Sequence, residues 1–160
     1  MRNRAAVCVA MPAVALCLMA MGPVASTSAS SASIKAVIRS YNGKIELAEG
    51  KVETAAGAYE QSSAPKDPAP VEAAINESVA VLSSLKAKVA LQSAHAPRVK
   101  KAKARIEKGI GEVIVGYGYL TTAFAEKATD PEAATAEAKK SVALAEEGRS
   151  NLLAGVKLLG

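Results

Sequence analysis

Residues 109–120 read Gly-Ile-Gly-Glu-Val-Ile-Val-Gly-Tyr-Gly-Tyr-Leu, and this segment decides the fold class. Taken alone it favours a β-strand, because valine, isoleucine and tyrosine are good strand formers and an interior glycine costs a helix about 1 kcal/mol relative to alanine. Apolar residues nevertheless recur through it in steps of three and four, and no partner strand is visible elsewhere in the sequence. Since a lone strand leaves its backbone groups unpaired, we expect a helix here.

The same periodicity extends over the rest of the chain after residue 30. Five prolines divide this part into four segments of similar length: Pro65, Pro68, Pro70, Pro97 and Pro131. Proline does not fit inside a regular helix, and each segment between the prolines has apolar positions at heptad spacing. We therefore predict four helices, at about 34–63, 71–95, 98–128 and 132–159. The fourth pattern is the loosest, because Arg149 occupies one of its core positions.

Helices of similar length with short connections favour antiparallel neighbours, so we predict an all-α, up-down-up-down four-helix bundle. The Asp130-Pro131-Glu132 sequence has the residue order of a helix N-terminus, with Asp130 as the cap. The second connection, His95-Ala96-Pro97, is very short. It either turns sharply or kinks one long helix, and a kink would allow two chains to exchange helices in a homodimer.

Glycines of the third segment lie in two rows with seven-residue spacing. Gly109 and Gly116 form one row, and Gly111 and Gly118 form the other. Because glycine has no side chain, each row makes a groove that a neighbouring helix can enter, which is the interpretation we favour. The alternative is a groove that holds a small apolar ligand, which would make the protein a carrier.

The N-terminal residues have the pattern of a secretory signal peptide. Two arginines precede an uncharged run from Ala5 to Met21, and small residues follow. We expect residues 1–29 to be removed after Ala29, or after Ala25 as the alternative, and the bundle to comprise residues 30–160. An uncleaved membrane anchor is a further alternative, but the run is shorter than the ~20 residues of a spanning helix. The expected location is secreted, periplasmic or associated with the cell envelope.

Residue types that carry catalysis are scarce in the expected mature chain. Both cysteines, Cys8 and Cys17, lie in the leader, and His95 is the only histidine. Di-iron bundles need Glu-x-x-His pairs, whereas Gln92 precedes His95 by three residues. We therefore expect no enzyme activity, no metal site and no cofactor.

Cations are concentrated at the start of the third segment. Six of the residues from Arg98 to Lys108 are Lys or Arg, and Lys100 and Lys103 are among them. The other four fall on one narrow stripe beside the core-facing positions: Arg98, Lys101, Arg105 and Lys108. Such a run is most often a solvated helix face.

The antiparallel arrangement gives the bundle a charge asymmetry. Residues 30–48, 82–112 and 146–160, here named the basic pole, carry 13 Lys and Arg against 5 Asp and Glu, a net charge of +8. Residues 49–81 and 113–145, the acidic half, carry 5 against 10, a net charge of −5. The basic pole also contains Lys86, Lys88 and His95.

A surface of this kind attracts anionic partners over a Debye length of ~8 Å. We expect an exported interaction module that uses the basic stripe and the pole to bind an anionic envelope polymer, a lipid headgroup or an acidic protein surface. Specific nucleic-acid binding is not expected, because only Tyr119 supplies an aromatic ring on the side of the stripe. A regulator of another exported protein is a further alternative.

Overall fold

The described residues, 29–63 and 66–160 of a computed structural model, form four α-helices and no strand. These are α1 (Ala29–Gln61), α2 (Ala69–Ala90), α3 (Pro97–Glu126) and α4 (Pro131–Leu158). Residues 109–120 lie inside α3, so the helical interpretation of the glycine-rich segment is confirmed. The predicted leader lies outside the described residues except for Ala29, which is the first residue of α1.

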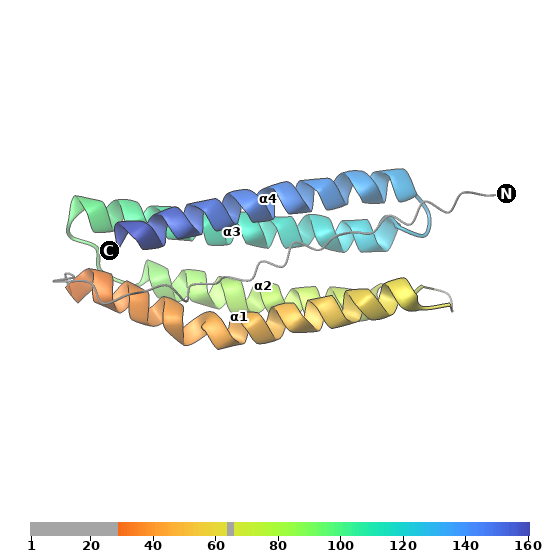
Figure 1. Cartoon of the computed structure of the whole chain (residues 1–160), viewed down its shortest axis with the longest axis horizontal. Helices are drawn as coiled ribbons and strands as arrows, with labels where there is room; N and C mark the ends of the chain where they lie inside the picture. Colours follow the sequence, from red (N-terminus) through yellow and green to blue (C-terminus); the bar gives the residue numbers. More distant parts are fainter. Residues whose placement is uncertain (1–28, 64–65) are drawn as a thin grey trace.

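Consecutive helices run in opposite directions, with α1 beside α2 and α3 beside α4 (Figure 1). The Tyr41 hydroxyl lies 2.7 Å from Ser84 Oγ, and Lys51 Nζ lies 2.6 Å from Glu77 Oε1. Later residues of α1 therefore meet earlier residues of α2, as an antiparallel pair requires. The described part of the chain is a helical bundle of alternating direction.

The connection between α2 and α3 is a turn. The predicted second helix extends to residue 95, whereas α2 ends at Ala90 and the chain reverses before Pro97. The backbone of Ala96 is extended, which is the conformation that a following proline favours. The kinked-helix interpretation is therefore wrong. The homodimer by helix exchange was inferred from such a kink, so this argument for it no longer applies.

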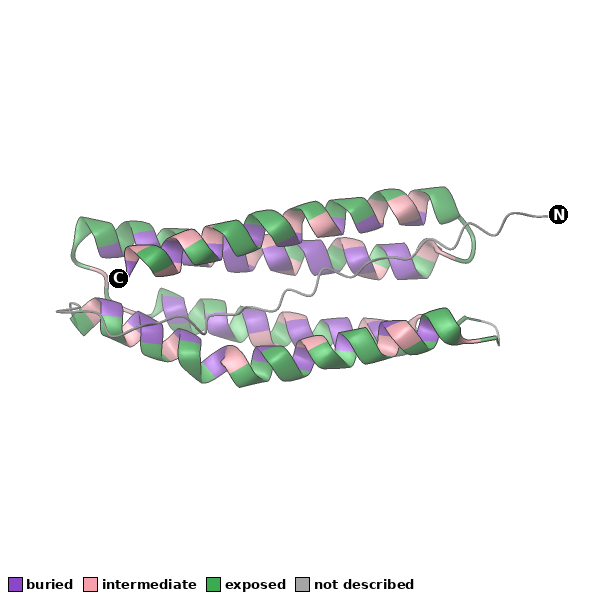
Figure 2. Ribbon diagram, in the orientation of Figure 1, coloured by how far each residue is buried: buried purple, intermediate pink, exposed green. Residues whose placement is uncertain are grey.

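The bundle has one core cluster to which all four helices contribute (Figure 2). The heptad positions of α1, α2 and α3 are buried almost without exception, and the rings of Tyr59 and Phe124 meet edge to face with centroids 5.1 Å apart. In α4 the predicted pattern fails at Arg149, which is exposed. The buried positions of α4 include a row of small residues that the sequence analysis did not single out: Ala134, Ser141, Gly148 and Gly155.

That row packs directly against the first glycine row of α3. A Cβ atom on Gly109 would lie 2.5 Å from the Gly148 carbonyl oxygen, and one on Gly148 would lie 2.7 Å from the Gly109 carbonyl oxygen. A Cβ on Gly155 would lie 2.9 Å from the carbonyl oxygen of Ala102. The backbones of α3 and α4 therefore touch, and the close-packing interpretation of this row is confirmed.

The start of α4 shows how local sequence fixes a helix boundary. The Asp130 side chain accepts a hydrogen bond of 3.0 Å from the Ala133 amide, and Pro131 occupies the first turn. This cap satisfies an amide that has no partner inside the helix. Together with the turn at residues 91–96, it sets the antiparallel order that gathers the cations.

Candidate functional site

Three segments of the basic pole contain no acidic residue at all. They are residues 30–45, 82–106 and 148–160, and the alternating helix directions bring them to the same end of the bundle (Figure 1). They carry twelve Lys and Arg residues: Lys35, Arg39, Lys44, Lys86, Lys88, Arg98, Lys100, Lys101, Lys103, Arg105, Arg149 and Lys157. The absence of carboxylates from these segments can be read from the sequence, but the net charge of the basic pole does not reveal it.

Some of these cations satisfy the C-terminal carbonyls of neighbouring helices. Lys103 Nζ donates to the carbonyl oxygens of Ala90 and Gln92, the latter at 2.9 Å, and so ties α3 to the end of α2. At the end of α4, Arg98 Nε donates to the Leu158 oxygen at 2.7 Å. The last carbonyls of a helix lack partners and carry partial negative charge, so a cation there stabilises the fold. Lys103 and Arg98 therefore have structural roles.

Lys35 has a similar role from α1. Its side chain is buried and its ammonium donates to the carbonyl oxygen of Gly160. This contact joins the start of α1 to the end of α4. It also explains why a lysine is tolerated at a buried position, since its charge has a backbone acceptor.

Lys108, the last residue of the predicted stripe, lies between two carboxylates. Its Nζ is 3.1 Å from Glu112 Oε1 and 3.1 Å from Glu147 Oε1. The hydrogen bonds to these side chains raise the pKa of Lys108 above its usual value. Helical periodicity places Lys108 beside Arg105. It cannot predict the contact with Glu147, because Glu147 lies on α4 and approaches Lys108 only in the folded chain. Lys108 is therefore less available to a partner than the rest of the stripe.

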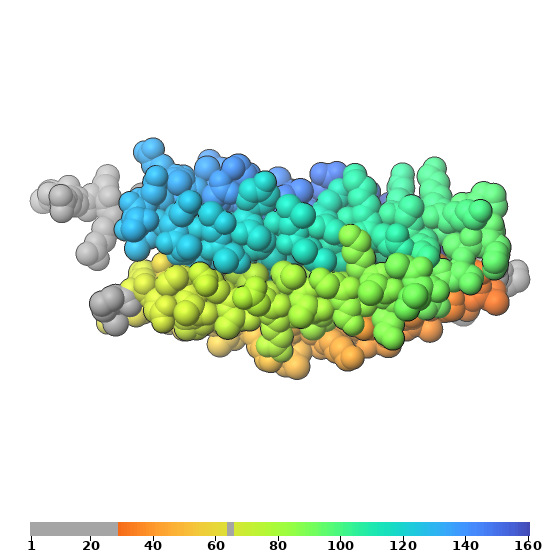
Figure 3. All heavy atoms as spheres, turned by 180° about the vertical axis from the view of Figure 1, so that it is seen from behind, coloured from red at the N-terminus to blue at the C-terminus, as the bar shows by residue number. Residues whose placement is uncertain are grey.

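The remaining predicted residues are directed to solvent. Lys101 and Arg105 are exposed and form no ion pair among the residues that the structure describes, and the same holds for Lys88 and Lys100. In Figure 3 long side chains project from the first turns of α3 (green) at this end of the molecule. These four cations are the centre of the candidate interface.

Two further predicted residues lie at the margins of this group. His95 is exposed in the turn between α2 and α3. Lys86 Nζ lies 3.1 Å from the position that a Cβ of Gly111 would take, so its side chain extends over α3. The second glycine row is thus approached by a lysine at Gly111, and no described atom lies within 4 Å of the Cβ position at Gly118.

Cations of the acidic half are in a different situation. Lys51 pairs with Glu77 at 2.6 Å and Lys140 with Glu137 at 2.6 Å, and Lys127 pairs with Glu60. Exposed pairs of this kind contribute little stability, but they neutralise the field of the lysine. The two halves of the bundle therefore differ in the pairing of their cations as well as in their number.

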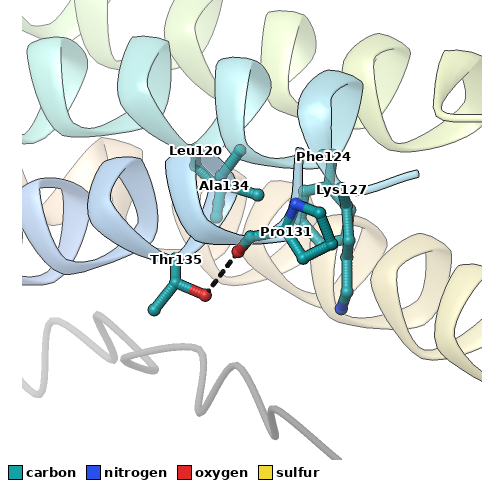
Figure 4. Close-up of a pocket in the computed structure, with 7 residues that line it drawn as sticks. Leu120, Phe124, Lys127, Pro131, Ala134 and Thr135 are labelled. Carbon is teal, nitrogen blue, oxygen red and sulfur yellow. Dashed lines mark hydrogen bonds between the residues drawn. The ribbon is translucent and has the colours of Figure 1, made fainter. Parts of the chain in front are cut away.

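A small apolar pocket lies far from the basic pole, where α3 passes into α4 (Figure 4). Its walls include Leu120, Phe124 and Pro131, and the Thr135 hydroxyl beside it donates a 2.8 Å hydrogen bond to the Pro131 carbonyl. The pocket has about 40 Å³ of free space. Sites for small-molecule ligands have several hundred Å³, so this pocket is too small to serve as one.

One carboxyl in the bundle has a strongly altered acidity. Burial, together with the charges of Glu53 and Glu46, raises the pKa of the half-buried Glu49 to about 7. Across the helices, burial and the charge of Glu49 raise the pKa of Tyr117 to about 12. The pocket walls include neither residue. We therefore treat Glu49 as a determinant of stability.

Comparisons with known proteins add no assignment: no family model, curated protein or solved structure matches the chain. Among the described residues, no group of three or more His, Cys, Asp or Glu is placed to hold a metal ion. The described helices include none that is both long and apolar enough to span a bilayer.

Proposed function

We propose that this protein is an exported, non-enzymatic interaction module that attaches to anionic material of the cell envelope through its basic pole. The observation that carries the proposal is the set of acid-free segments, 30–45, 82–106 and 148–160, at one end of the bundle. An anionic partner that approaches this end meets three segments that carry cations and no Asp or Glu. Export rests on the leader-like pattern of the N-terminal residues.

Binding by this surface is electrostatic and does not require a cavity. Lys88, Lys100, Lys101 and Arg105 have no internal partner among the described residues, so they need not break an ion pair before they bind. Each Lys or Arg near an anionic surface contributes roughly 1 kcal/mol, and the attraction weakens as salt shortens the Debye length. We infer binding that is strong at low ionic strength and is lost gradually at high ionic strength.

The carrier function is less well supported than the interaction module. Gly109 and Gly116, which would have lined a ligand groove, face the backbone of α4 at 2.5 Å and 3.1 Å from their Cβ positions. The α4 backbone therefore fills the groove of this first row, and the Lys86 ammonium lies beside the second row at Gly111. We place the anionic interface first for this reason.

The test compares two variants that lose equal charge at opposite ends of the molecule. In the first, Lys88, Lys100 and Lys101 become glutamine together with Arg105. In the control, four lysines of the acidic half that each have a carboxylate partner become glutamine: Lys51, Lys66, Lys127 and Lys140. Binding to immobilised polyphosphate is measured at low and near-physiological salt.

We expect the first variant to bind at least tenfold more weakly and the control to remain within about twofold of the unaltered protein, since only the first loses cations without internal partners. Equal losses in both variants would show that net charge alone is responsible. Polyphosphate binding by the unaltered protein that does not change with salt would refute the electrostatic proposal.

A further inference from the structure

Leu91 is an apolar side chain in an unexpected place. Four large apolar side chains are exposed among the described residues, and Leu91 is the most exposed, at 76%. The others, Leu47, Val115 and Leu153, lie within α1, α3 and α4, and Leu153 belongs to the acid-free segment 148–160. Leu91 instead directly follows α2 and opens the turn to α3 at the basic pole.

The backbone around Leu91 is held firmly. Its own amide donates to the Ala87 carbonyl at 3.2 Å, and the carbonyls on either side, of Ala90 and Gln92, both accept from Lys103. The turn is therefore fixed against α3 while the leucine side chain stays in solvent. Exposure of Leu91 is thus built into an ordered part of the fold.

The sequence around Leu91 contains cations and no acid, and Glu107 Oε1 lies 3.8 Å from the Lys103 ammonium that holds the turn. Lys88 precedes it by one helical turn, and Arg98, Lys100 and Lys101 follow at the start of α3. From residue 78 to residue 106 the chain has no Asp or Glu. Residues 91–96 of the turn, Leu-Gln-Ser-Ala-His-Ala, include no Asp, Glu, Lys or Arg.

An apolar side chain surrounded by cations is complementary to an anionic lipid surface, which has a layer of phosphate groups above an apolar boundary. Phosphate groups attract lysine and arginine, and the boundary below them accepts an apolar side chain. A soluble polyanion offers the first layer only, so it gives no advantage to an exposed leucine. Charge complementarity and the position of Leu91 therefore favour a bilayer over an anionic polymer.

We propose that the basic pole docks on an anionic lipid bilayer, with Leu91 inserted at the headgroup boundary and Lys88, Lys100 and Lys101 at the lipid phosphates. This inference rests on the proposed function, since it names the anionic partner of the same surface. The bundle stays folded and the helices remain outside the hydrocarbon. Only the turn between α2 and α3 enters the interface.

The absence of tryptophan from the chain permits a direct test. A Leu91→Trp variant places a single fluorophore at the tip, and a Leu47→Trp variant places one at another exposed leucine, which lies on α1 outside the basic pole's acid-free segments. Both are purified after export, so both carry the same N-terminal segment. They are mixed with vesicles of phosphatidylcholine alone or of phosphatidylcholine with phosphatidylglycerol, with and without brominated lipid.

We expect the Leu91→Trp emission to move to shorter wavelength and to be quenched by brominated lipid only when phosphatidylglycerol is present. The Leu47→Trp emission is expected to stay unchanged. A separate Leu91→Ser variant is expected to bind phosphatidylglycerol vesicles roughly tenfold more weakly, because it loses burial of one leucine, and to bind polyphosphate as before.

Three outcomes would overturn the inference. The first is vesicle binding in which the Leu91 and Leu47 probes respond alike, and the second is a loss of polyphosphate binding in Leu91→Ser that equals its loss of vesicle binding. Insertion into phosphatidylcholine alone would also overturn it, because no anionic lipid would be needed. If neither vesicles nor polyphosphate bind the unaltered protein, the proposed function itself fails.

Discussion

Glycines recur at seven-residue spacing in two regions of the bundle, with opposite consequences. In α1, Gly43, Gly50 and Gly57 have no described atom within 4 Å of their Cβ positions outside their own helix. In the contact between α3 and α4, the Cβ positions of Gly109 and Gly148 each fall within 3 Å of the opposite backbone. The same spacing therefore marks an open helix surface in one region and touching backbones in the other.

The difference lies in the partner helix. Gly109 faces Gly148, Gly116 faces Ser141, and Gly155 faces Ala102, so small residues meet across this contact, with apolar side chains such as Leu152 and Val113 packed beside them. No comparable row of small residues opposes the glycines of α1 at contact distance. Glycines at seven-residue spacing therefore predict a close contact between helices only when the second helix carries a matching row of small residues.

The largest effect is expected when the close contact is broken. In Gly148→Ala the new methyl group would lie 2.7 Å from the Gly109 oxygen and from Val113 Cγ2, and backbone atoms cannot move away as a flexible side chain can. The two helices must separate, and we expect a loss of about 3 kcal/mol or more in the free energy of unfolding. Chemical denaturation followed by circular dichroism measures this loss, and a change below about 1 kcal/mol would contradict the backbone contact.

A smaller effect is expected from the carboxyl that α1 keeps half-buried. Since the pKa of Glu49 is raised to about 7 in the folded chain, the folded state binds the proton more tightly than the unfolded state. Stability should therefore decrease as pH rises from about 4.5 to about 7. The Glu49→Gln variant should be about 1 kcal/mol more stable than the unaltered protein at pH 8, after allowance for solvent screening, with the difference vanishing near pH 4.

The control for this pH dependence is an acid on the same helix. Glu46→Gln removes one negative charge near Glu49 but leaves the half-buried carboxyl in place, so it should reduce the pH dependence only in part. Denaturation at several pH values compares the two. A pH profile that is identical in Glu49→Gln and the unaltered protein would exclude Glu49 as its source.

The smallest effect is expected at the open glycines, and it has the opposite sign to that of Gly148→Ala. Gly50 is exposed in the interior of α1, and an added methyl group meets no described atom within 4 Å. Replacement by alanine should stabilise the helix by up to about 1 kcal/mol, because alanine loses less backbone freedom on folding. Destabilisation by Gly50→Ala in the same denaturation experiment would show that α1 has a close partner there after all.

Much of the fold can be predicted from the sequence, because helix-breaking prolines and apolar periodicity are local signals. The helical state of residues 109–120 follows from periodicity once a lone strand is excluded. The ends of helices are less predictable: α2 ends at Ala90, and Lys103, thirteen residues later, donates to the carbonyls of Ala90 and Gln92. The small-residue row of α4 was missed because an apolar heptad scan gives no weight to Gly148 or Gly155.

The candidate site was predictable in outline only. Antiparallel topology and charge counts place the cations together, but periodicity cannot say which of them have partners. Lys108 pairs with Glu147 and Arg98 with the Leu158 carbonyl, and both partners come from a helix that is distant in sequence. The exposure of Leu91 could not be predicted from the sequence either, because the position of Leu91 depends on the turn to which Lys103 is hydrogen-bonded.

The most direct measurement of the central claim is a residue-level map of binding. Polyphosphate is titrated into the ¹⁵N-labelled protein and the backbone amide signals are followed by NMR. We predict shifts concentrated in residues 86–106 and 148–160, reversed by added salt, with residues 49–81 and 113–145 unaffected. Shifts that spread evenly over both halves, or that concentrate in the acidic half, would contradict the assignment of the basic pole as the binding surface.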